Sequence, residues 1–293
     1  MASRRSELGV RLAIGAALGA AKALSPLDVT ALRRLGVVTG DLAWRLDGRS
    51  ARVTRTNIDL VYADRDPAWR RRLVRESLRH TAMTLTEAVA LWTWPLPRVA
   101  SLLRNVEGDH RLRPGTLVIA PHFGNWEYIG YFLNTVAPLT ALYQRPASAA
   151  LDRALATARG RFGTRSAADS IGGLRRIVRA LQTGGLVIVL PDQVPRGGAG
   201  VMAPCFGQPA LTMSLVSRLL QRVDANVVIG AVTRVEGGFS LGFEATVDAV
   251  RDADPEISAR AINAAIETIV ARDPAQYQWE YKRFRSAERP GLY

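Results

Sequence analysis

The sequence predicts an α/β fold: one domain with a mixed, largely parallel central sheet flanked by helices, preceded by an N-terminal membrane-associating helix. Short apolar runs of strand length alternate with stretches of helical periodicity through the second half of the chain. A hydrophobic content of 48% over 293 residues is enough for one large core. Because no repeat, low-complexity tract or long Ser/Gly linker divides the chain, we expect an N-terminal helical extension over residues 1–40 and a single catalytic domain over residues 41–293.

The extension contains an apolar stretch that is too short to cross a membrane unaided. Leu12–Ala21 has ten residues between Arg11 and Lys22, whereas a spanning helix needs about 20. We expect it to lie in or dip into the cytoplasmic leaflet, where basic residues meet anionic lipid. A helix packed on the domain is one alternative, and a signal peptide is another. The basic helix around residues 31–34 and the lack of cysteine pairs count against export.

A long helix, or a pair of helices, is predicted over Pro67–Trp94. Apolar side chains recur there at near-helical spacing, with arginines between them. They are Leu73, Leu78, Met83, Leu85, Val89 and Leu91. Pro95 should end the helix, because the residue before a proline disfavours helical backbone.

Beyond residue 116, strands and helices are expected to alternate. The predicted strands are Leu117–Ala120, Leu139–Tyr143, Leu186–Leu190, Val227–Thr233 and Phe239–Ala245. The predicted helices are Ala149–Arg161, Ile171–Thr183, Thr212–Arg222 and Ile257–Ala271. Polar pairs follow two of the strands, at residues 144–145 and 192–193. If the strands run parallel, these pairs converge on the edge of the sheet where His122 lies.

The stretch TLVIAPHFGNWE, residues 116–127, contains the candidate catalytic residues. A proline and a glycine end the strand, and Asn125 can cap the helix that follows. His122 then lies in a turn at the carboxyl end of a strand, where open α/β sheets bind ligands. A histidine can take a proton from a hydroxyl, and a neighbouring carboxylate, here Glu127, can fix its tautomer. From spacing alone, a partly buried histidine in a helix-capping turn is the alternative.

The formal net charge is +13, and arginine supplies nearly all of it. Such an excess attracts nucleic acid, an anionic membrane or an anionic substrate. The arginines are spread over amphipathic helices, and the sequence has no nucleic-acid-binding motif, so we expect no nucleic-acid partner. Because a guanidinium binds phosphate through two parallel hydrogen bonds, a phosphorylated glycolipid and an acidic carrier protein both suit this surface.

The single cysteine, Cys205, has no partner for a disulfide or a zinc site. No histidine or acid adjoins it, so we interpret it as a packed side chain and not as a nucleophile. The absence of cysteine pairs fits a cytoplasmic-facing location. His80 and His110 stand in segments that resemble no metal ligand set, so we predict no catalytic metal.

The HFGNWE segment resembles the His-x4-acid signature of the glycerolipid acyltransferase superfamily, in the form found in the bacterial lipid A secondary (late) acyltransferases. Those membrane-associated enzymes esterify hydroxyls of a lipid A precursor with acyl chains from acyl carrier protein. Further segments resemble that family in the same order: RTNI (55–58), the helix at 87–92, LYQRP (142–146), LPDQ (190–193) and DPAQYQW with KRF (273–284). The Glu-Gly-Thr-Arg block of the phospholipid-making branch is absent, and PDQVP stands roughly where it is expected.

The resemblance implies an O-acyltransferase on the cytoplasmic face of the inner membrane, with acyl-acyl carrier protein as co-substrate and no cofactor. His122 and Glu127 are the implied catalytic residues, with Glu127 holding the imidazole. Arg145, Asp192 and Asn125 are implied to bind substrate or order the site, and Asn125 also reads as a turn residue. A structural ion pair between Arg145 and Asp192 is the alternative. Backbone amides at 123–125, or Arg145, would stabilise the tetrahedral intermediate.

Three other functions are compatible with the residues. The acceptor can be another membrane lipid, such as a lysophospholipid, an aminolipid or a different glycolipid, because the sequence does not display the surface of the acceptor pocket. A non-catalytic membrane-binding protein is a second class, although the intact HFGNWE and PDQ segments argue against it. A nucleic-acid-binding protein is the third, and steeply salt-dependent DNA binding without acyl transfer would identify it.

Overall fold

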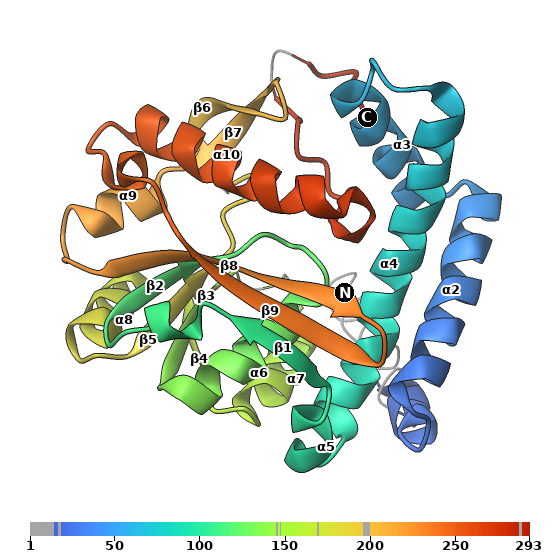
Figure 1. The fold of residues 1–293 in the computed structure, drawn as a ribbon, viewed down its shortest axis with the longest axis horizontal. Coiled ribbons are helices and arrows are strands. Elements are labelled where there is room, and N and C mark those ends of the chain that lie inside the picture. The colour runs from blue at the N-terminus through green and yellow to red at the C-terminus, as the bar shows by residue number, and fades with distance from the viewer. Residues whose placement is uncertain are drawn as a thin grey trace, which may run out of the picture.

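The fold is described from a computed structural model, which covers residues 15–16, 19–144, 146, 148–168, 170–195, 200–286 and 289–293 (Figure 1). Parts of the predicted apolar helix Leu12–Ala21 lie outside the described residues, as does Arg145. Residues 19–24 are helical.

A seven-stranded sheet forms the centre of the domain, in the order β1-β9-β8-β2-β5-β3-β4. The strands are β1 (Leu103–Glu107), β2 (Thr116–Ile119), β3 (Leu139–Tyr143), β4 (Arg165–Ala168), β5 (Leu186–Val189), β8 (Asn226–Val235) and β9 (Gly238–Ala245). Neighbouring strands are parallel except β8 and β9, which form an antiparallel hairpin. The predicted mixed, largely parallel sheet is confirmed, and each of the five predicted strands is present.

Helices cover both faces of this sheet. They are α6 (Trp126–Val136), α7 (Ala149–Gly160), α8 (Ile171–Gln182), α9 (Leu215–Leu220) and α10 (Pro255–Arg272). In β2, Leu117 and Ile119 pack in one core with residues of α8 and α10, whereas Val118 packs in a second core with residues of α6. The central strands are therefore buried on both faces, which is why they read as uninterrupted apolar runs in the sequence.

The N-terminal helices pack along one side of the domain (Figure 1). They are α2 (Val29–Leu46), α3 (Arg49–Val61), α4 (Pro67–Thr93) and the short α5 (Leu96–Ala100). The predicted long helix is thus one helix, α4. A Cβ atom on Gly36 or Gly40 of α2 would lie 2.6 Å or 2.5 Å from a Cα atom of α4, so α2 lies directly against α4. Helix α2 continues through residue 40, and the predicted division of the chain there stays a prediction.

The predicted helix Thr212–Arg222 is wrong over its first residues. Residues 208–213 form strand β7 (Gln208–Met213), which pairs antiparallel with β6 (Gly200–Cys205), and helix α9 begins only at Leu215. The two turn residues, Phe206 and Gly207, have φ of 50° and 70°, as a two-residue hairpin with a primed turn requires. Cys205 is 1% exposed, which confirms that it is a packed side chain.

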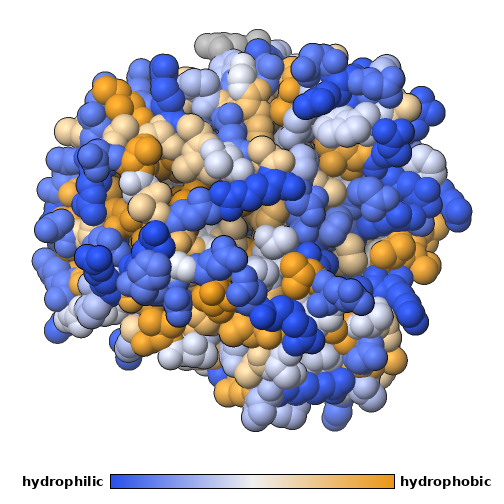
Figure 2. All heavy atoms as spheres, in the orientation of Figure 1, coloured by the Kyte–Doolittle hydropathy of each residue, from blue (hydrophilic) through white to orange (hydrophobic). Residues whose placement is uncertain are grey.

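Among the described residues, no helix has both the length and the hydropathy needed to cross a membrane. Figure 2 shows hydrophilic residues spread over the whole of one face, with apolar residues between them. Helix α2 leaves three apolar side chains four residues apart in solvent: Val38, Leu42 and Leu46 are 64%, 52% and 71% exposed. The membrane-associating helix stays a prediction.

Candidate active site

His122 lies in the turn between β2 and α6, and the C-terminal part of the chain holds that turn. The His122 carbonyl accepts a hydrogen bond from the Gln278 N–H at 3.0 Å, and the Gly124 N–H donates to the Gln276 carbonyl at 2.9 Å. Gly124 has φ of 58°, and a Cβ atom there would lie 1.7 Å from the carbonyl oxygen of Val232. A side chain at position 124 would therefore displace the turn that carries His122.

Asp192, just after the neighbouring strand β5, binds both the backbone and the ring of His122. Its Oδ2 accepts the His122 N–H at 2.8 Å, and its Oδ1 lies 2.6 Å from Nδ1 of the ring. The two side chains are 3% and 16% exposed. Because an ionised carboxylate only accepts hydrogen bonds, Nδ1 donates to Asp192, and in the neutral form of the ring the lone pair is on Nε2. This is the tautomer that a general base facing away from Asp192 needs.

The Asp192 carboxylate stays ionised although it is buried. Burial alone would raise its pKa, but the charge and hydrogen bonds of His122, helped by the positive charge of Arg283, hold the pKa below its ordinary value. Tyr277 lies close by, where burial and the negative charge of Asp192 raise the pKa of its hydroxyl well above the ordinary value. Asp192 is therefore the ionised group that orients His122.

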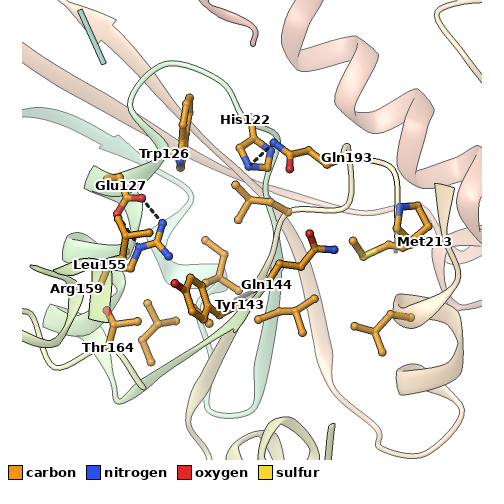
Figure 3. Close-up of a pocket in the computed structure, with 18 of the residues that line it drawn as sticks. His122, Trp126, Glu127, Tyr143, Gln144, Leu155, Arg159, Thr164, Gln193 and Met213 are labelled. Atoms are coloured by element: carbon orange, nitrogen blue, oxygen red, sulfur yellow. Dashed lines mark hydrogen bonds and ion pairs between the residues drawn. The ribbon is translucent and has the colours of Figure 1, made fainter. Parts of the chain in front are cut away.

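The second ring nitrogen of His122 faces the side-chain amide of Gln193. Gln193 Nε2 lies 3.3 Å from His122 Nε2 and donates to Gln278 Oε1 at 3.1 Å. The Trp126 ring meets the imidazole edge-on, with ring centroids 5.1 Å apart. Figure 3 shows Trp126 and Gln193 on opposite sides of His122. Gln193 donates one amide hydrogen to Gln278, and its second amide hydrogen can be donated to His122 Nε2 or to a group that lies next to it.

Glu127 is paired with Arg159 and not with His122 (Figure 3). Its two carboxylate oxygens accept from Arg159 Nη2 at 2.5 Å and Nε at 3.1 Å. Burial alone would lower the pKa of this guanidinium, but the Glu127 charge raises it overall. The expectation that Glu127 holds the imidazole is therefore wrong. Helix α6 begins at Trp126 and directs the Glu127 carboxylate to α7, while Asp192 takes Nδ1.

Asn125 belongs to a buried charge cluster behind the turn, which we call the Glu87 cluster. Asn125 is fully buried and donates from Nδ2 to Glu87 Oε2 at 3.0 Å. Glu87 Oε1 also accepts from Arg33 Nε at 2.6 Å and from Arg234 Nε at 2.8 Å. Asn125 does not line the cavity described below, so its position fits a turn residue and gives no support to substrate binding.

Two further α4 residues complete the Glu87 cluster. Arg234 contacts His80 Nδ1 at 2.8 Å and donates to Thr84 Oγ1 at 2.9 Å. Burial would raise the pKa of Glu87, but the two arginines lower it overall. Burial and the charge of Arg234 lower the pKa of His80 to about 4. The cluster therefore holds an ionised glutamate, two guanidinium groups and a neutral histidine at pH 7.

A cavity of about 340 Å³ opens beside His122, and most of its wall is apolar (Figure 3). Polar lining residues include His122, Gln193, Gln144 and the Glu127–Arg159 pair. The apolar lining comes from α6, α7, β3, β5 and the residues around β7 and α9: Trp126, Gly130, Leu139, Ala141, Leu142, Leu155, Phe162, Ile188, Leu190, Pro195, Met213 and Leu215. Such a wall suits a long apolar ligand with one polar reacting group near His122.

The structure brings His122 and Asp192 together, as the strand order predicts, because β2 and β5 are parallel neighbours. Arg145, the residue after Gln144, lies outside the described residues, so neither its substrate contacts nor an ion pair with Asp192 can be assigned. Within the described part of the chain, no three or more His, Cys, Asp or Glu side chains are grouped as metal ligands.

In the sequence, Gln193 was recognised at this edge of the sheet without an assigned role, whereas two other residues of this region, Arg159 and Arg234, were missed. Gln193 follows Asp192 directly, and the PDQ segment is a usable signal for it. Arg159 lies four residues after Leu155 on α7, and its role depends on the tertiary approach of α7 to α6. Arg234 lies in strand β8 and is 8% exposed. Its partner Glu87 is 147 positions away, and nothing in the sequence around Arg234 indicates that pairing.

Comparisons with known proteins agree with the resemblance over nearly the whole chain. A family model described as bacterial lipid A biosynthesis acyltransferase matches residues 7–286. The chain is 28% identical over 261 residues to the lipid A biosynthesis palmitoleoyltransferase of Escherichia coli K12, covering 86% of this chain and 84% of that protein. It is 25% identical over 271 residues to the lauroyltransferase of the same organism, with 89% and 87% covered. It is also 25% identical over 297 residues to the myristoyltransferase, with 97% and 87% covered.

Proposed function

The chain belongs to the bacterial lipid A biosynthesis acyltransferase family and is an acyltransferase, and we propose that it transfers a fatty acyl chain from acyl carrier protein to a hydroxyl of a lipid A precursor. The observation that carries the chemistry is the His122–Asp192 pair, whose second ring nitrogen, Nε2, borders a largely apolar cavity. The names of the related Escherichia coli proteins support the choice of acceptor class.

His122 acts as the general base in this proposal. Its Nε2 takes the proton of the acceptor hydroxyl while the hydroxyl oxygen attacks the thioester carbonyl. The C–O bond forms, the C–S bond breaks as the tetrahedral intermediate collapses, and the imidazolium returns its proton to the leaving thiolate. Asp192 stabilises the imidazolium through its short contact to Nδ1, so Asp192 takes the orienting role first expected of Glu127. No cofactor beyond the acyl-acyl carrier protein is required.

Two of the backbone donors first expected for the tetrahedral intermediate already have partners. The Phe123 N–H donates to the Pro121 carbonyl and the Gly124 N–H to the Gln276 carbonyl, so neither amide is free. The Gln193 amide lies beside Nε2, where the reacting hydroxyl must come. We therefore assign Gln193 to hold the hydroxyl or the oxyanion that develops next to it.

Glu127 supports the reaction through Arg159 in this proposal. The ion pair lies in the cavity wall, and the Arg159 guanidinium also stacks 5.5 Å from the Tyr143 ring centroid. Without Glu127, a largely buried guanidinium would lose its bidentate partner and the wall would rearrange. Glu127→Ala should therefore lose activity by deforming the cavity, while leaving the His122–Asp192 pair in place.

We further propose that the enzyme works at the cytoplasmic face of the inner membrane and takes its donor from an acidic carrier protein. The net charge of +13 favours anionic partners of both kinds. The exposed stripe of Val38, Leu42 and Leu46 on α2 is flanked by Arg45 and Arg49, the pattern of a helix face that lies on anionic lipid. The stripe adds to the membrane contact proposed for residues 12–21.

Acyl transfer by membranes that contain the protein tests this proposal. Acyl carrier proteins with several chain lengths are supplied together with a tetra-acyl or penta-acyl lipid A precursor, and lysophospholipids are tested beside it. We expect transfer to the lipid A precursor that disappears in His122→Ala. Transfer only to another lipid would keep the chemistry and replace the acceptor. A folded protein that acylates none of these acceptors would contradict the proposal.

A further inference from the structure

The cavity beside His122 extends in two directions (Figure 3). Met213 lies on one side of His122, and Glu127, Arg159, Leu155 and Thr164 lie on the other. We call the second part the α6–α7 arm, after the helices that carry Glu127 and Arg159. Because the reacting nitrogen lies between the two parts, a donor that reacts there can place its acyl chain in one of them and the carrier arm in the other.

Polar groups in the wall of the α6–α7 arm already have partners. Glu127 and Arg159 neutralise each other through two hydrogen bonds. The Thr164 hydroxyl accepts from Asn134 Nδ2 at 2.6 Å, and that amide also donates to the Gly130 carbonyl at 2.7 Å. With these groups satisfied, the arm offers mainly apolar surface to a ligand, which suits a hydrocarbon chain.

Gly130 lies in the wall of this arm. It follows Glu127 by three residues and precedes Asn134 by four, so the three residues share one face of α6. A Cβ atom built on Gly130 meets no other atom within 4 Å, and Gly130 lines the cavity. A side chain at this position would therefore project into the empty space of the arm.

The local backbone does not explain a glycine at position 130. Gly130 lies inside α6, where glycine is a poor helix former, and its φ is not positive. Close helix packing does not explain it either, unlike Gly36 and Gly40, where a Cβ atom would meet α4 at 2.6 Å and 2.5 Å. A residue larger than glycine at position 130 would fill part of the empty space in the arm.

We propose that the α6–α7 arm holds the acyl chain of the donor and that Gly130 determines the chain length it accepts. This inference rests on the acyl-transfer function proposed above. Each methyl group added at position 130 takes volume from the arm. Long acyl chains therefore no longer fit in the arm, whereas short acyl chains still fit.

The test compares wild type, Gly130→Ala and Gly130→Leu as full-length proteins in membranes. Each receives an equimolar mixture of acyl carrier proteins with chains of several lengths, and mass spectrometry measures the acyl composition of the product. We expect Gly130→Leu to lower transfer of the longest chain that wild type uses by about 10-fold or more relative to shorter chains, the range seen when a pocket loses room for one or two methylenes. Gly130→Ala should shift the composition in the same direction by less.

Gly160→Leu is the matched control. Gly160 ends helix α7, also meets no atom within 4 Å of a built Cβ, and does not line the cavity. It should keep the wild-type composition. An unchanged acyl composition of the product in both Gly130 variants would overturn the inference, and so would an equal loss of all chain lengths. In either case, an active wild type would still support the proposed function. Wild type without transfer from any donor would overturn both. If Gly130→Leu fails to accumulate, the composition with Gly130→Ala decides.

Discussion

A buried carboxylate lies on each side of the turn at residues 121–127, and the two carboxylates differ in their partners. On the cavity side, Asp192 is 3% exposed and orients a histidine whose other nitrogen has only an amide contact at 3.3 Å. On the far side, Glu87 is 1% exposed, and two arginines and an asparagine occupy both of its oxygens. Both carboxylates have a pKa below the ordinary value, since partners outweigh burial.

The difference separates a reactive group from the structure that positions it. A buried network of ion pairs and hydrogen bonds holds its members in one arrangement, and removal of one member leaves an uncompensated charge. The Glu87 cluster therefore fixes the backbone of the turn through Asn125 and through Arg234, which approaches the Gly124 carbonyl at 3.5 Å. On the other side, His122 Nε2 contacts the Gln193 amide and borders the cavity, where the proposed substrate hydroxyl would approach. In the proposed reaction, the chemistry takes place on the cavity side of the turn, outside the Glu87 cluster.

Removing the base should have the largest effect. His122→Ala should lower the rate of acyl transfer by about 10²–10⁴-fold, because it removes the proposed general base. Asp192→Asn should fall in a similar range, since the amide no longer fixes the Nδ1–H tautomer. Initial rates in membranes measure both, and the melting temperature of each variant shows whether it is folded. A folded His122→Ala protein with wild-type turnover would refute the assignment of the base.

Opening the Glu87 cluster should reduce stability. Glu87→Leu leaves Arg33 and Arg234 without their shared carboxylate and should cost about 3–5 kcal/mol of unfolding free energy. Denaturant unfolding measures the loss. Glu76→Leu is the control on the same helix, because Glu76 is 46% exposed and bonds Arg79 at the surface, so it should cost about 1 kcal/mol or less. Equal losses in the two variants would contradict the role given to the cluster.

Acid should lower the stability of the folded protein through His80, which belongs to the Glu87 cluster. Its pKa is about 4 in the folded protein against 6.5 in the unfolded chain, so between these values the unfolded chain binds more protons. Stability should therefore fall as pH drops from 6.5 toward 4, by up to about 3.5 kcal/mol at about 1.4 kcal/mol per pKa unit. The difference between wild type and His80→Gln isolates this contribution, because Glu280, whose pKa burial raises, acts in the opposite direction. Parallel pH profiles of the two proteins would rule it out.

An exposed ion pair should show the smallest effect and so define the lower limit of the comparison. Arg272 and Glu244 form two hydrogen bonds, yet their side chains are 54% and 46% exposed. Arg272→Ala should cost about 0–1 kcal/mol, and less at high salt, since solvent screens the pair. Urea unfolding at two salt concentrations measures this. A loss as large as that of Glu87→Leu would show that burial is not what separates the two kinds of pair.

Local patterns predicted most of the elements and the turn that carries His122. The central strands were recognisable because both faces are buried, and His122 because a proline and a glycine follow an apolar run. Strands β1 and β4 were missed, since LRNVE and RSAA lie at the edges of the sheet and contain few apolar residues. The β6–β7 hairpin was missed because its last residues join the apolar pattern of α9.

The sequence by itself determined the α/β class, the family, the turn that carries His122 and the convergence of Asp192 on it, because strand order in a parallel sheet brings successive carboxyl ends to one edge. Only the tertiary structure decided which carboxylate orients the imidazole. Glu127 is five residues from His122 and Asp192 is 70 residues away, yet helix α6 directs Glu127 to Arg159 while β5 delivers Asp192 to Nδ1. Partner choice depends on side-chain direction at the point of approach, and spacing along the chain does not encode it.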